Sequence, residues 1–117
     1  MKTSELTGAA LDWAVAKCEG LLAYGYKDDA GLLLITLSTG EVEYFKPTLD
    51  WALVGPIIER EMIELVPQSP ALWEAMYRNQ HIPHDGPTPL IAAMRCYVAS
   101  KLGDTVDIPK ELTQCNS

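Results

Sequence analysis

The chain has 117 residues and a formal net charge of −7, with nine basic residues spread singly along it. This length supports one hydrophobic core, so we expect a single domain over residues 1–112 and a flexible tail over residues 113–117. The charge argues against a duplex DNA or RNA binder, whose affinity comes mainly from neutralising phosphates. No apolar run approaches the ~20 residues that span a bilayer, and no signal-peptide pattern occurs, so we expect a cytoplasmic protein with no membrane partner.

The three cysteines, Cys18, Cys96 and Cys115, predict neither a disulfide framework nor a zinc site, because their number is odd and no C-x-x-C pair occurs. Cys18 and Cys96 fall in helical patterns and are expected to be small core residues, as free cysteine often is. Cys115 falls in the expected tail. The sequence has neither a Gly-Lys-Ser/Thr phosphate loop nor a dinucleotide-binding glycine pattern, so no cofactor is expected.

The first part of the chain predicts a helix, a short strand and a β-hairpin. In order, the pattern predicts a helix, a strand, a turn and two hairpin strands over residues 4–19, 21–26, 27–31, 32–37 and 41–46. The helix follows from apolar residues recurring at intervals of three and four. The hairpin follows from two β-rich runs that flank a short loop containing Gly40. Its first strand is apolar on both faces, which is typical of a strand covered on both sides, whereas its second strand alternates, which is typical of a position nearer an edge.

The second part predicts two longer helices around further strands. In order, the pattern predicts a helix, a strand, a turn, a strand, a polar loop, a helix and an edge strand over residues 48–61, 63–66, 67–70, 72–78, 79–86, 89–102 and 105–108. Thr48 can cap the first of these helices, with Asp50 in its first turn, where the helix dipole favours negative charge. Gly55 and Pro56 are then expected to break or kink that helix.

Two segments, residues 55–59 and 86–95, place Gly-Pro directly before an apolar, helix-compatible run. In the structural interpretation, Gly86 turns the chain and Thr88 caps a helix whose first residue is proline. In the functional interpretation, the glycines have no side chain to cover the backbone, so that a ligand can approach backbone N–H groups at a helix end. The structural interpretation accounts well for residues 86–89. Residues 55–59 are the stronger candidate for a site, because Gly-Pro there interrupts a helix already begun.

Arg95 lies among the apolar residues of its predicted helix, where an arginine must pair with another group, reach the surface or face a cavity. Asp50 and Glu59 are the natural partners for a salt bridge. Alternatively, Arg95 anchors a carboxylate or phosphate by bidentate hydrogen bonding. Trp51 is the tryptophan best placed to stack on a base or ring, because it falls in a first helical turn just before the expected break. The other two tryptophans are core residues by default.

Catalytic and metal-binding motifs receive little support. His81, His84 and Asp85 form a possible ligand set in a loop, but no second cluster supports it, so no metal is expected. No Ser/His/Asp set has a recognisable spacing, and Cys96 lies mid-helix rather than on a sharp strand–helix turn. The sequence therefore favours a non-catalytic protein.

Three ordered segments, residues 3–17, residues 50–60 and residues 86–102, resemble the NinX-like proteins of tailed, lambdoid phages of enteric bacteria. The resemblance runs over nearly the whole chain. Residues 73–75 followed by residues 88–93 are also similar to small phage domains built as a helix–sheet–helix sandwich. The resemblance implies an α+β fold with a mainly antiparallel sheet of about four to five strands and helices on both faces. It supplies no mechanism, because these phage proteins have no assigned activity.

We expect a non-catalytic binding module for a small anionic or nucleotide-like ligand, with a pocket where the predicted helix break meets the start of the last long helix. The expected lining residues are Tyr44, Trp51, Gly55, Pro56, Glu59, Trp73, Gly86, Thr88 and Arg95. In the phage context, such a module could sequester a host defence signal in the host cytoplasm. Two alternatives stay open: an acidic protein-interaction module that binds and inhibits a host protein, and a small enzyme acting on a nucleotide-related metabolite. A homodimer is compatible with all three, because an apolar hairpin edge can pair across a two-fold axis.

Overall fold

The computed structural model of the chain describes residues 1–21 and 24–113. In chain order, its elements are η1 (Thr3–Glu5), α1 (Gly8–Cys18), β1 (Tyr24–Lys27), β2 (Leu33–Thr36), β3 (Val42–Tyr44), η2 (Pro47–Leu49), α2 (Trp51–Glu61), β4 (Ile63–Ser69), β5 (Leu72–Tyr77), β6 (His84–Gly86), α3 (Pro89–Leu102) and α4 (Lys110–Thr113). The strands form two 3-stranded antiparallel sheets, β1-β2-β3 and β4-β5-β6. The fold is therefore α+β, as expected, but its strands do not form the single sheet that the resemblance implied.

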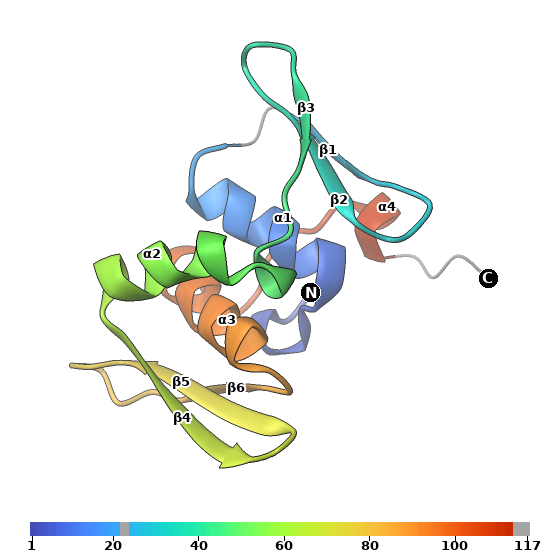
Figure 1. Cartoon of the computed structure of the whole chain (residues 1–117). Helices are drawn as coiled ribbons and strands as arrows, with labels where there is room; N and C mark the ends of the chain where they lie inside the picture. The colour runs from blue at the N-terminus through green and yellow to red at the C-terminus, as the bar shows by residue number, and fades with distance from the viewer. Residues whose placement is uncertain (22–23, 114–117) are drawn as a thin grey trace.

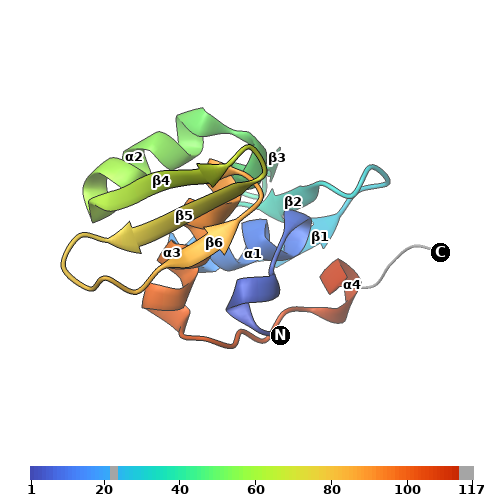
Figure 2. The ribbon, with the colours of Figure 1, turned by 90° about the horizontal axis from the view of Figure 1, so that it is seen from below.

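The helices form the middle layer, between the two sheets (Figure 1). α3 packs against β5 and β6 on one side and against α1 on the other, while α1 contacts β2 of the second sheet. Figure 2 views the molecule from below, with the β4–β6 sheet in front of α3. The expectation of helices on both faces of one sheet is thus corrected: here a sheet lies on either side of the helices.

α3 is central because it is buried around most of its circumference, which is typical of a core helix. Its small side chains let the neighbouring helix and strands approach closely, and its larger ones fill the spaces between them. The buried residues of α3 are Leu90, Ala92, Ala93, Met94, Arg95, Cys96, Tyr97 and Val98. α1 is similarly enclosed, and the two helices supply much of the core. Each large apolar side chain buried there contributes roughly 1.5–3 kcal/mol.

The predicted helix over residues 4–19 is divided in two, because η1 ends before α1 begins. Thr7 between them is extended, and Gly8 has a φ of +54°, a conformation that favours glycine. Leu6, in the same connection, has no exposed surface. The division lets this segment leave the helical path and insert Leu6 into the core.

α2 runs without interruption through Gly55 and Pro56, so the predicted break is wrong. Proline lacks the N–H that would bond to the carbonyl four residues earlier, which here belongs to Ala52. Ala52 is exposed, so water can satisfy that carbonyl in place of the missing N–H. The helix therefore continues to Glu61 without a break.

The cap of α2 also differs from the expectation. Asp50 is the N-cap, and its side chain accepts a hydrogen bond from the Ala52 N–H at 3.0 Å. Thr48 lies in η2 and contacts Asp12 of α1 instead. Thr48 was the expected cap, but its contact with α1 engages it elsewhere, and Asp50, two residues later, caps the helix instead.

The β1–β3 sheet contains the predicted strand and hairpin, although residues 22–23 lie outside the described residues. β3 lies at the sheet edge, as its alternating sequence predicted. β2 is the central strand, but only one of its faces is fully covered: Leu33 and Ile35 are buried, whereas Leu34 and Thr36 are half-buried. The expectation that this strand is covered on both sides is therefore wrong.

In the β4–β6 sheet, the predicted strand over residues 72–78 is confirmed as β5. The predicted strand over residues 63–66 is longer than expected, because β4 continues through Pro67 to Ser69 with an irregular register between these two residues. Proline is tolerated there because β4 is an edge strand. β6 lies within the expected polar loop; its three residues are too few to show an alternating pattern.

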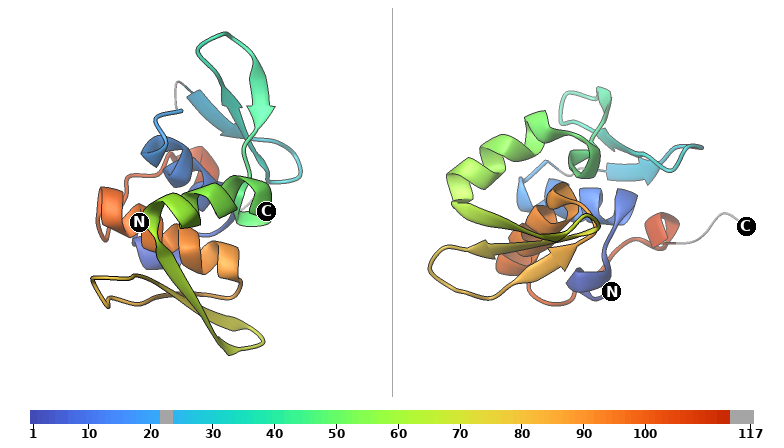
Figure 3. Two further views of the ribbon diagram at one scale, coloured as in Figure 1. Left: turned by 60° about the vertical axis from the view of Figure 1, so that its left-hand side comes forward. Right: turned by 60° about the horizontal axis from the view of Figure 1, so that its bottom comes forward.

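The last part of the described chain runs back along the first residues. Met1 and Val106 exchange backbone hydrogen bonds, and Lys2 forms an isolated bridge with Thr105 in place of the predicted edge strand. α4 then packs beside α1 and β1. The right-hand view of Figure 3 shows this segment passing the N-terminus. The expected tail beyond residue 113, including Cys115, lies outside the described residues. None of the described helices is long and apolar enough to cross a membrane.

Candidate functional site

The predicted pocket residues of α2 lie on an open helical surface. Trp51 is the first residue of α2, and 54% of it is exposed. At Gly55, one turn later, an added Cβ would have no neighbouring atom within 4 Å. Pro56 and Glu59 are exposed farther along the helix. This surface offers an aromatic ring beside a bare stretch of helix, without the concave backbone that a helix break was expected to create.

The other Gly-Pro segment is closed by packing. Gly86 ends β6 and is buried against the first turns of α3; a Cβ at this position would lie 2.7 Å from the backbone nitrogen of Ala92. Thr88 is the N-cap of α3, and its hydroxyl accepts a hydrogen bond from the Ile91 N–H at 3.2 Å. Thr88 begins the helix, as the structural interpretation predicts, whereas Gly86, which was expected to turn the chain, ends a strand and lets that strand lie directly on the helix.

Arg95 is 9% exposed, and its guanidinium binds backbone carbonyls. Its Nε donates to the Leu6 carbonyl at 2.9 Å, and its Nη1 donates to the Asp85 carbonyl at 2.9 Å. Burial lowers the pKa of Arg95, and the nearby Asp85 acts in the opposite direction. Within the described residues, Arg95 forms no salt bridge with Asp50 or Glu59. These contacts tie the N-terminal segment and β6 to α3.

Tyr44 and Trp73, which were expected to line the same pocket, belong to different sheets. Tyr44 is on β3, whereas Trp73 is on β5, where it pairs with Pro67 and Gly86. The helical layer lies between these sheets (Figure 1). The structure therefore distributes the predicted site residues over α2, α3 and both sheets.

The outer side of the β1–β3 sheet carries exposed aromatic and aliphatic side chains. Leu34 lies opposite Tyr26 on β1 and opposite Tyr44 on β3, so these three residues form a row across one face of the sheet. Val42, two residues before Tyr44, shares that face. The exposed fractions are 37% for Tyr26, 50% for Val42 and 53% for Tyr44. We call these four residues the aromatic face; the helices cover the other side of the sheet.

Charged groups lie next to the aromatic face. The Tyr44 hydroxyl donates to Asp28 Oδ2 at 2.8 Å, and Lys46 Nζ lies 5.9 Å from the centre of the Tyr44 ring. Hydrogen bonds from the Leu32 N–H and from Tyr44 lower the pKa of Asp28, so this carboxylate remains ionised at neutral pH. Residues 24–46 contain four carboxylates and two lysines. The surroundings of the aromatic face are thus acidic, like the chain as a whole.

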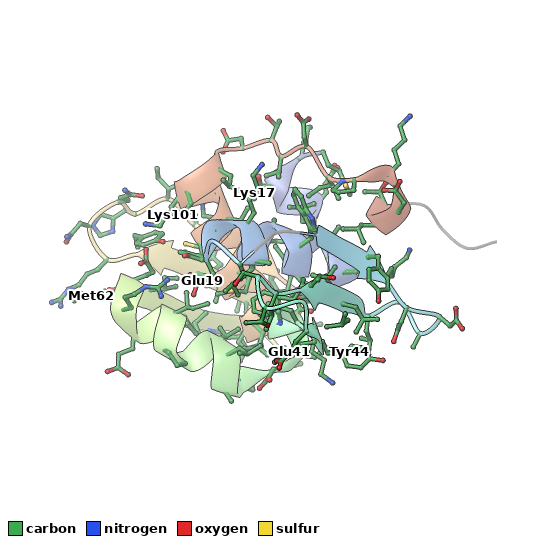
Figure 4. The ribbon with its side chains drawn as sticks, turned by 90° about the horizontal axis from the view of Figure 1, so that it is seen from above. Lys17, Glu19, Glu41, Tyr44, Met62 and Lys101 are labelled. Carbon is green, nitrogen blue, oxygen red and sulfur yellow. The ribbon has the colours of Figure 1, made fainter. Side chains whose placement is uncertain are left out.

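A second polar cluster joins the C-terminal ends of α1, α2 and α3. Arg60 lies 2.8 Å from Glu19 and 3.1 Å from Glu61, and Lys101 lies 3.2 Å from Glu61. The Tyr97 hydroxyl donates to Glu19 and accepts from Arg60. Hydrogen bonds from Arg60 and Tyr97 lower the pKa of Glu19, against the opposing effect of its partial burial. Figure 4 shows Glu19 and Lys101 gathered at this end. Because the cations have carboxylate partners, the cluster serves to hold the helices together.

Two adjoining hollows lie beside the C-terminal half of α3. Both are lined by His84, Ala99 and Asp104, and their volumes are about 210 and 120 Å³. Lys2 lines the larger hollow, and Ile82 lines the smaller one. We refer to them together as the Ala99 hollow, because the small Ala99 side chain leaves space where they meet. None of the predicted pocket residues lines it.

Sequence reasoning missed both the aromatic face and the Ala99 hollow. The alternation of Val42 and Tyr44 was a usable signal for the first, since alternate strand residues share a face. The hollow had no local signal, because residues 2, 84, 99 and 104 meet only after folding. The described residues contain no group of three or more His, Cys, Asp or Glu side chains placed to hold a metal ion.

A comparison with known families identifies one whose profile reaches all three ordered sequence segments. The profile of the bacteriophage P22 NinX family matches residues 2–101, which include every element from η1 to nearly the end of α3. No curated protein matches the chain. The family match covers most of the sequence and both Gly-Pro segments. The chain therefore belongs to the NinX family of bacteriophage P22.

Proposed function

We propose that this phage protein is a non-catalytic protein-interaction module whose aromatic face binds a basic surface of a host protein. One observation carries the proposal: Tyr26, Val42 and Tyr44 are exposed on the outer face of a small sheet, around the half-buried Leu34. Gathered exposed apolar side chains are typical of interaction surfaces, and tyrosine is enriched at protein interfaces. The sheet beneath is braced by the helices, so the surface needs little ordering on binding.

The charge around the aromatic face supports a basic partner. Asp28 accepts the Tyr44 hydroxyl, and Lys46 of the same chain lies over the Tyr44 ring. Lysine or arginine of a partner could use the same two attractions, a carboxylate and an aromatic face. The net charge of −7 would also steer a basic surface toward the protein, and this steering weakens with salt.

Affinity capture from host lysate tests the proposal when wild type is compared with the double variant Tyr26→Ala, Tyr44→Ala. Both side chains are exposed, so we expect the variant to keep its fold. We expect wild type to capture a specific host protein. The captured amount should fall as NaCl rises from about 0.05 to about 0.5 M, and the double variant should not capture it. Circular dichroism of both proteins verifies that the fold is retained.

The matched control is the double variant Val66→Ala, Leu72→Ala on the other sheet. These residues are 38% and 39% exposed, similar to Tyr26, but lie on β4 and β5. It should capture the same protein as wild type. Equal capture by all three proteins, or no captured protein that depends on the aromatic face, would overturn the proposal.

Binding of a small nucleotide-like ligand is a second proposal, supported by the exposure of Trp51 beside the bare surface at Gly55. An exposed indole can stack on a base. Thermal-shift measurements against nucleotides and cyclic dinucleotides test it: a ligand should raise the Tm of wild type but not that of Trp51→Ala. The absence of any shift, or a shift that survives this substitution, contradicts the proposal.

A further inference from the structure

The backbone of β3 has one side that faces away from its sheet. β3 is an edge strand that pairs with β2, and no strand of the described chain lies on its other side. At the two ends of β3, the Glu41 carbonyl accepts from the Leu37 N–H at 2.8 Å, and the Phe45 N–H donates to β2 at 3.0 Å. Backbone groups of successive residues alternate in direction along an antiparallel ladder. Those of Val42 and Tyr44 therefore point outward, where a further strand could bond to them.

The other sheet edges are less suited to a further strand. β4 contains Pro67, which has no N–H to donate, and its register is irregular at that residue. α4 packs beside β1. At β6, the Asp85 carbonyl already accepts a hydrogen bond from Arg95. Among the described strands, β3 thus has the edge best suited to strand addition.

The side chains along this edge alternate between apolar and acidic. Val42 and Tyr44 are exposed on the aromatic face, and by the same alternation Glu41 and Glu43 lie on the opposite side of the sheet. Both glutamates are exposed, and neither forms a salt bridge with another described residue. On β2, the residue opposite Glu43 is the apolar Ile35. The edge therefore presents two carboxylates on one side and an apolar surface on the other.

We propose that an extended segment of alternating basic and apolar residues adds to β3 as an antiparallel fourth strand of this sheet. The segment belongs to the host partner of the proposed function, on which this inference rests. Its apolar residues lie opposite Val42 and Tyr44 and exchange backbone hydrogen bonds with them. Its lysines or arginines lie opposite Glu41 and Glu43, since directly opposite residues share a face and opposite charges there attract. In strand addition, backbone bonds give affinity and alternate side chains give specificity.

A second copy of this chain fits the same edge less well. Two β3 strands paired around a two-fold axis would bring the glutamates of both copies together, and like charges across strands are destabilising. The nearby Lys46 ammonium lies over the Tyr44 ring, 5.9 Å from its centre. The net charge of −7 adds repulsion between copies. A basic segment avoids both costs, so the charge of the edge favours it.

Titration of the ¹⁵N-labelled protein with the capped hexapeptide Lys-Val-Lys-Val-Lys-Val, followed by NMR, tests this inference. At about 5 mM peptide, which loads a site of millimolar Kd, we expect amide shift changes centred on Val42 and Tyr44. The absence of shifts at β3 would overturn the inference. Shifts at β3 that depend on the concentration of the protein alone would indicate a second copy and would also overturn it.

Two methylated forms of this peptide carry the same charges and separate strand pairing from simple attraction. N-methylation of the valines removes the N–H groups that face β3, so binding should weaken at least about tenfold. N-methylation of the lysines removes N–H groups that face away from β3, so this peptide should bind as the unmodified one does. Equal binding by the two methylated peptides would contradict strand addition.

Two variants of the protein make the same comparison. Val42→Ala shortens the side chain but keeps the outward N–H, whereas Val42→Pro removes that N–H, which the pairing with β2 does not use. Val42→Pro should bind the unmodified peptide about tenfold more weakly than Val42→Ala. Equal binding by the two folded variants would contradict the inference, and the methylated peptides decide the matter if Val42→Pro fails to fold.

Capture from host lysate separates this inference from the proposed function. A host protein that is lost with the double variant Tyr26→Ala, Tyr44→Ala but captured equally by Val42→Ala and Val42→Pro would support the proposed function and overturn strand addition. Capture that falls with Val42→Pro relative to Val42→Ala is the result expected if the partner adds a strand.

Discussion

Replacing Asp12 by Asn should remove a loss of stability that wild type suffers as the pH rises. Asp12 lies on α1 and is 2% exposed. Its Oδ1 accepts the Thr48 N–H at 2.9 Å, and its Oδ2 accepts the Thr48 hydroxyl at 3.2 Å. Within the described residues it has no cationic partner. Burial raises the pKa of Asp12 to about 7, although both hydrogen bonds act to lower it.

The sign and size of the effect follow from this pKa. The unfolded chain ionises Asp12 near its ordinary pKa of 3.8, whereas the folded chain holds the proton until about 7. The stability that protonated Asp12 contributes is therefore fully present below the pKa of the unfolded chain, and it is lost as the pH rises to the pKa of the folded chain. At 1.36 kcal/mol per pKa unit, the loss amounts to about 4 kcal/mol between pH 4 and pH 8. Asparagine at this position can accept the Thr48 N–H without ionising.

Urea unfolding of wild type and Asp12→Asn at several pH values from about 4 to about 8 measures this effect. The free energy of unfolding of wild type, relative to that of the variant, should fall by about 4 kcal/mol over this range. Taking the difference removes the contributions of groups that both proteins share. Asp29→Asn, which removes an exposed carboxylate, should instead run parallel to wild type. A wild-type-to-Asp12→Asn difference that is constant or rises with pH would refute the reasoning.

The remaining predictions concern the Gly-Pro segments and Arg95. Gly55→Ala should stabilise the protein by about 0.5–1 kcal/mol in urea unfolding, because its added Cβ meets open space in a helix. Gly86→Ala should destabilise it by about 1–3 kcal/mol in the same assay, because its Cβ would lie 2.7 Å from the Ala92 nitrogen; equal effects at the two glycines would contradict the packing difference. Arg95→Met should lower the unfolding free energy by about 2–4 kcal/mol, since the buried Leu6 carbonyl and the partly buried Asp85 carbonyl lose their donor, and an unchanged stability would show that these bonds are dispensable. Thr88→Ala should lower thermal stability by the equivalent of about 1 kcal/mol through loss of the cap, with a Tm equal to that of wild type as the contrary result.

Elements with strong local signals could be predicted from the sequence. The helix over residues 89–102 has the predicted bounds, because Thr88 supplies a cap and Pro89 fits a first turn. The strand over residues 72–77 followed from the alternation around Trp73. β6 had no comparable signal, because three residues are too short to establish a period. Local chemistry therefore located the elements but did not specify which of them pair.

The candidate sites were harder to predict, because their residues are distant in sequence. Arg95 was expected to contact Asp50, Glu59 or an anion, but its partners are carbonyls of residues 6 and 85. A buried arginine takes the acceptors that the fold places within its reach, and a backbone carbonyl leaves no side-chain signature in a sequence. Similarly, the sequence indicated that Val42 and Tyr44 share a face, but only the position of the helices determines that this face is the uncovered one.

By itself, the sequence determined the α+β class, most helix and strand positions and the membership of the phage family. These depend on short-range patterns: periodicity, caps and ordered motifs. Only the tertiary structure decided that the strands form two sheets with the helices between them, that α2 passes through Gly55 and Pro56, and that α3 occupies the space beside Gly86. These outcomes depend on which surfaces meet, because burial and hydrogen-bond satisfaction are shared between segments that the sequence separates by tens of residues.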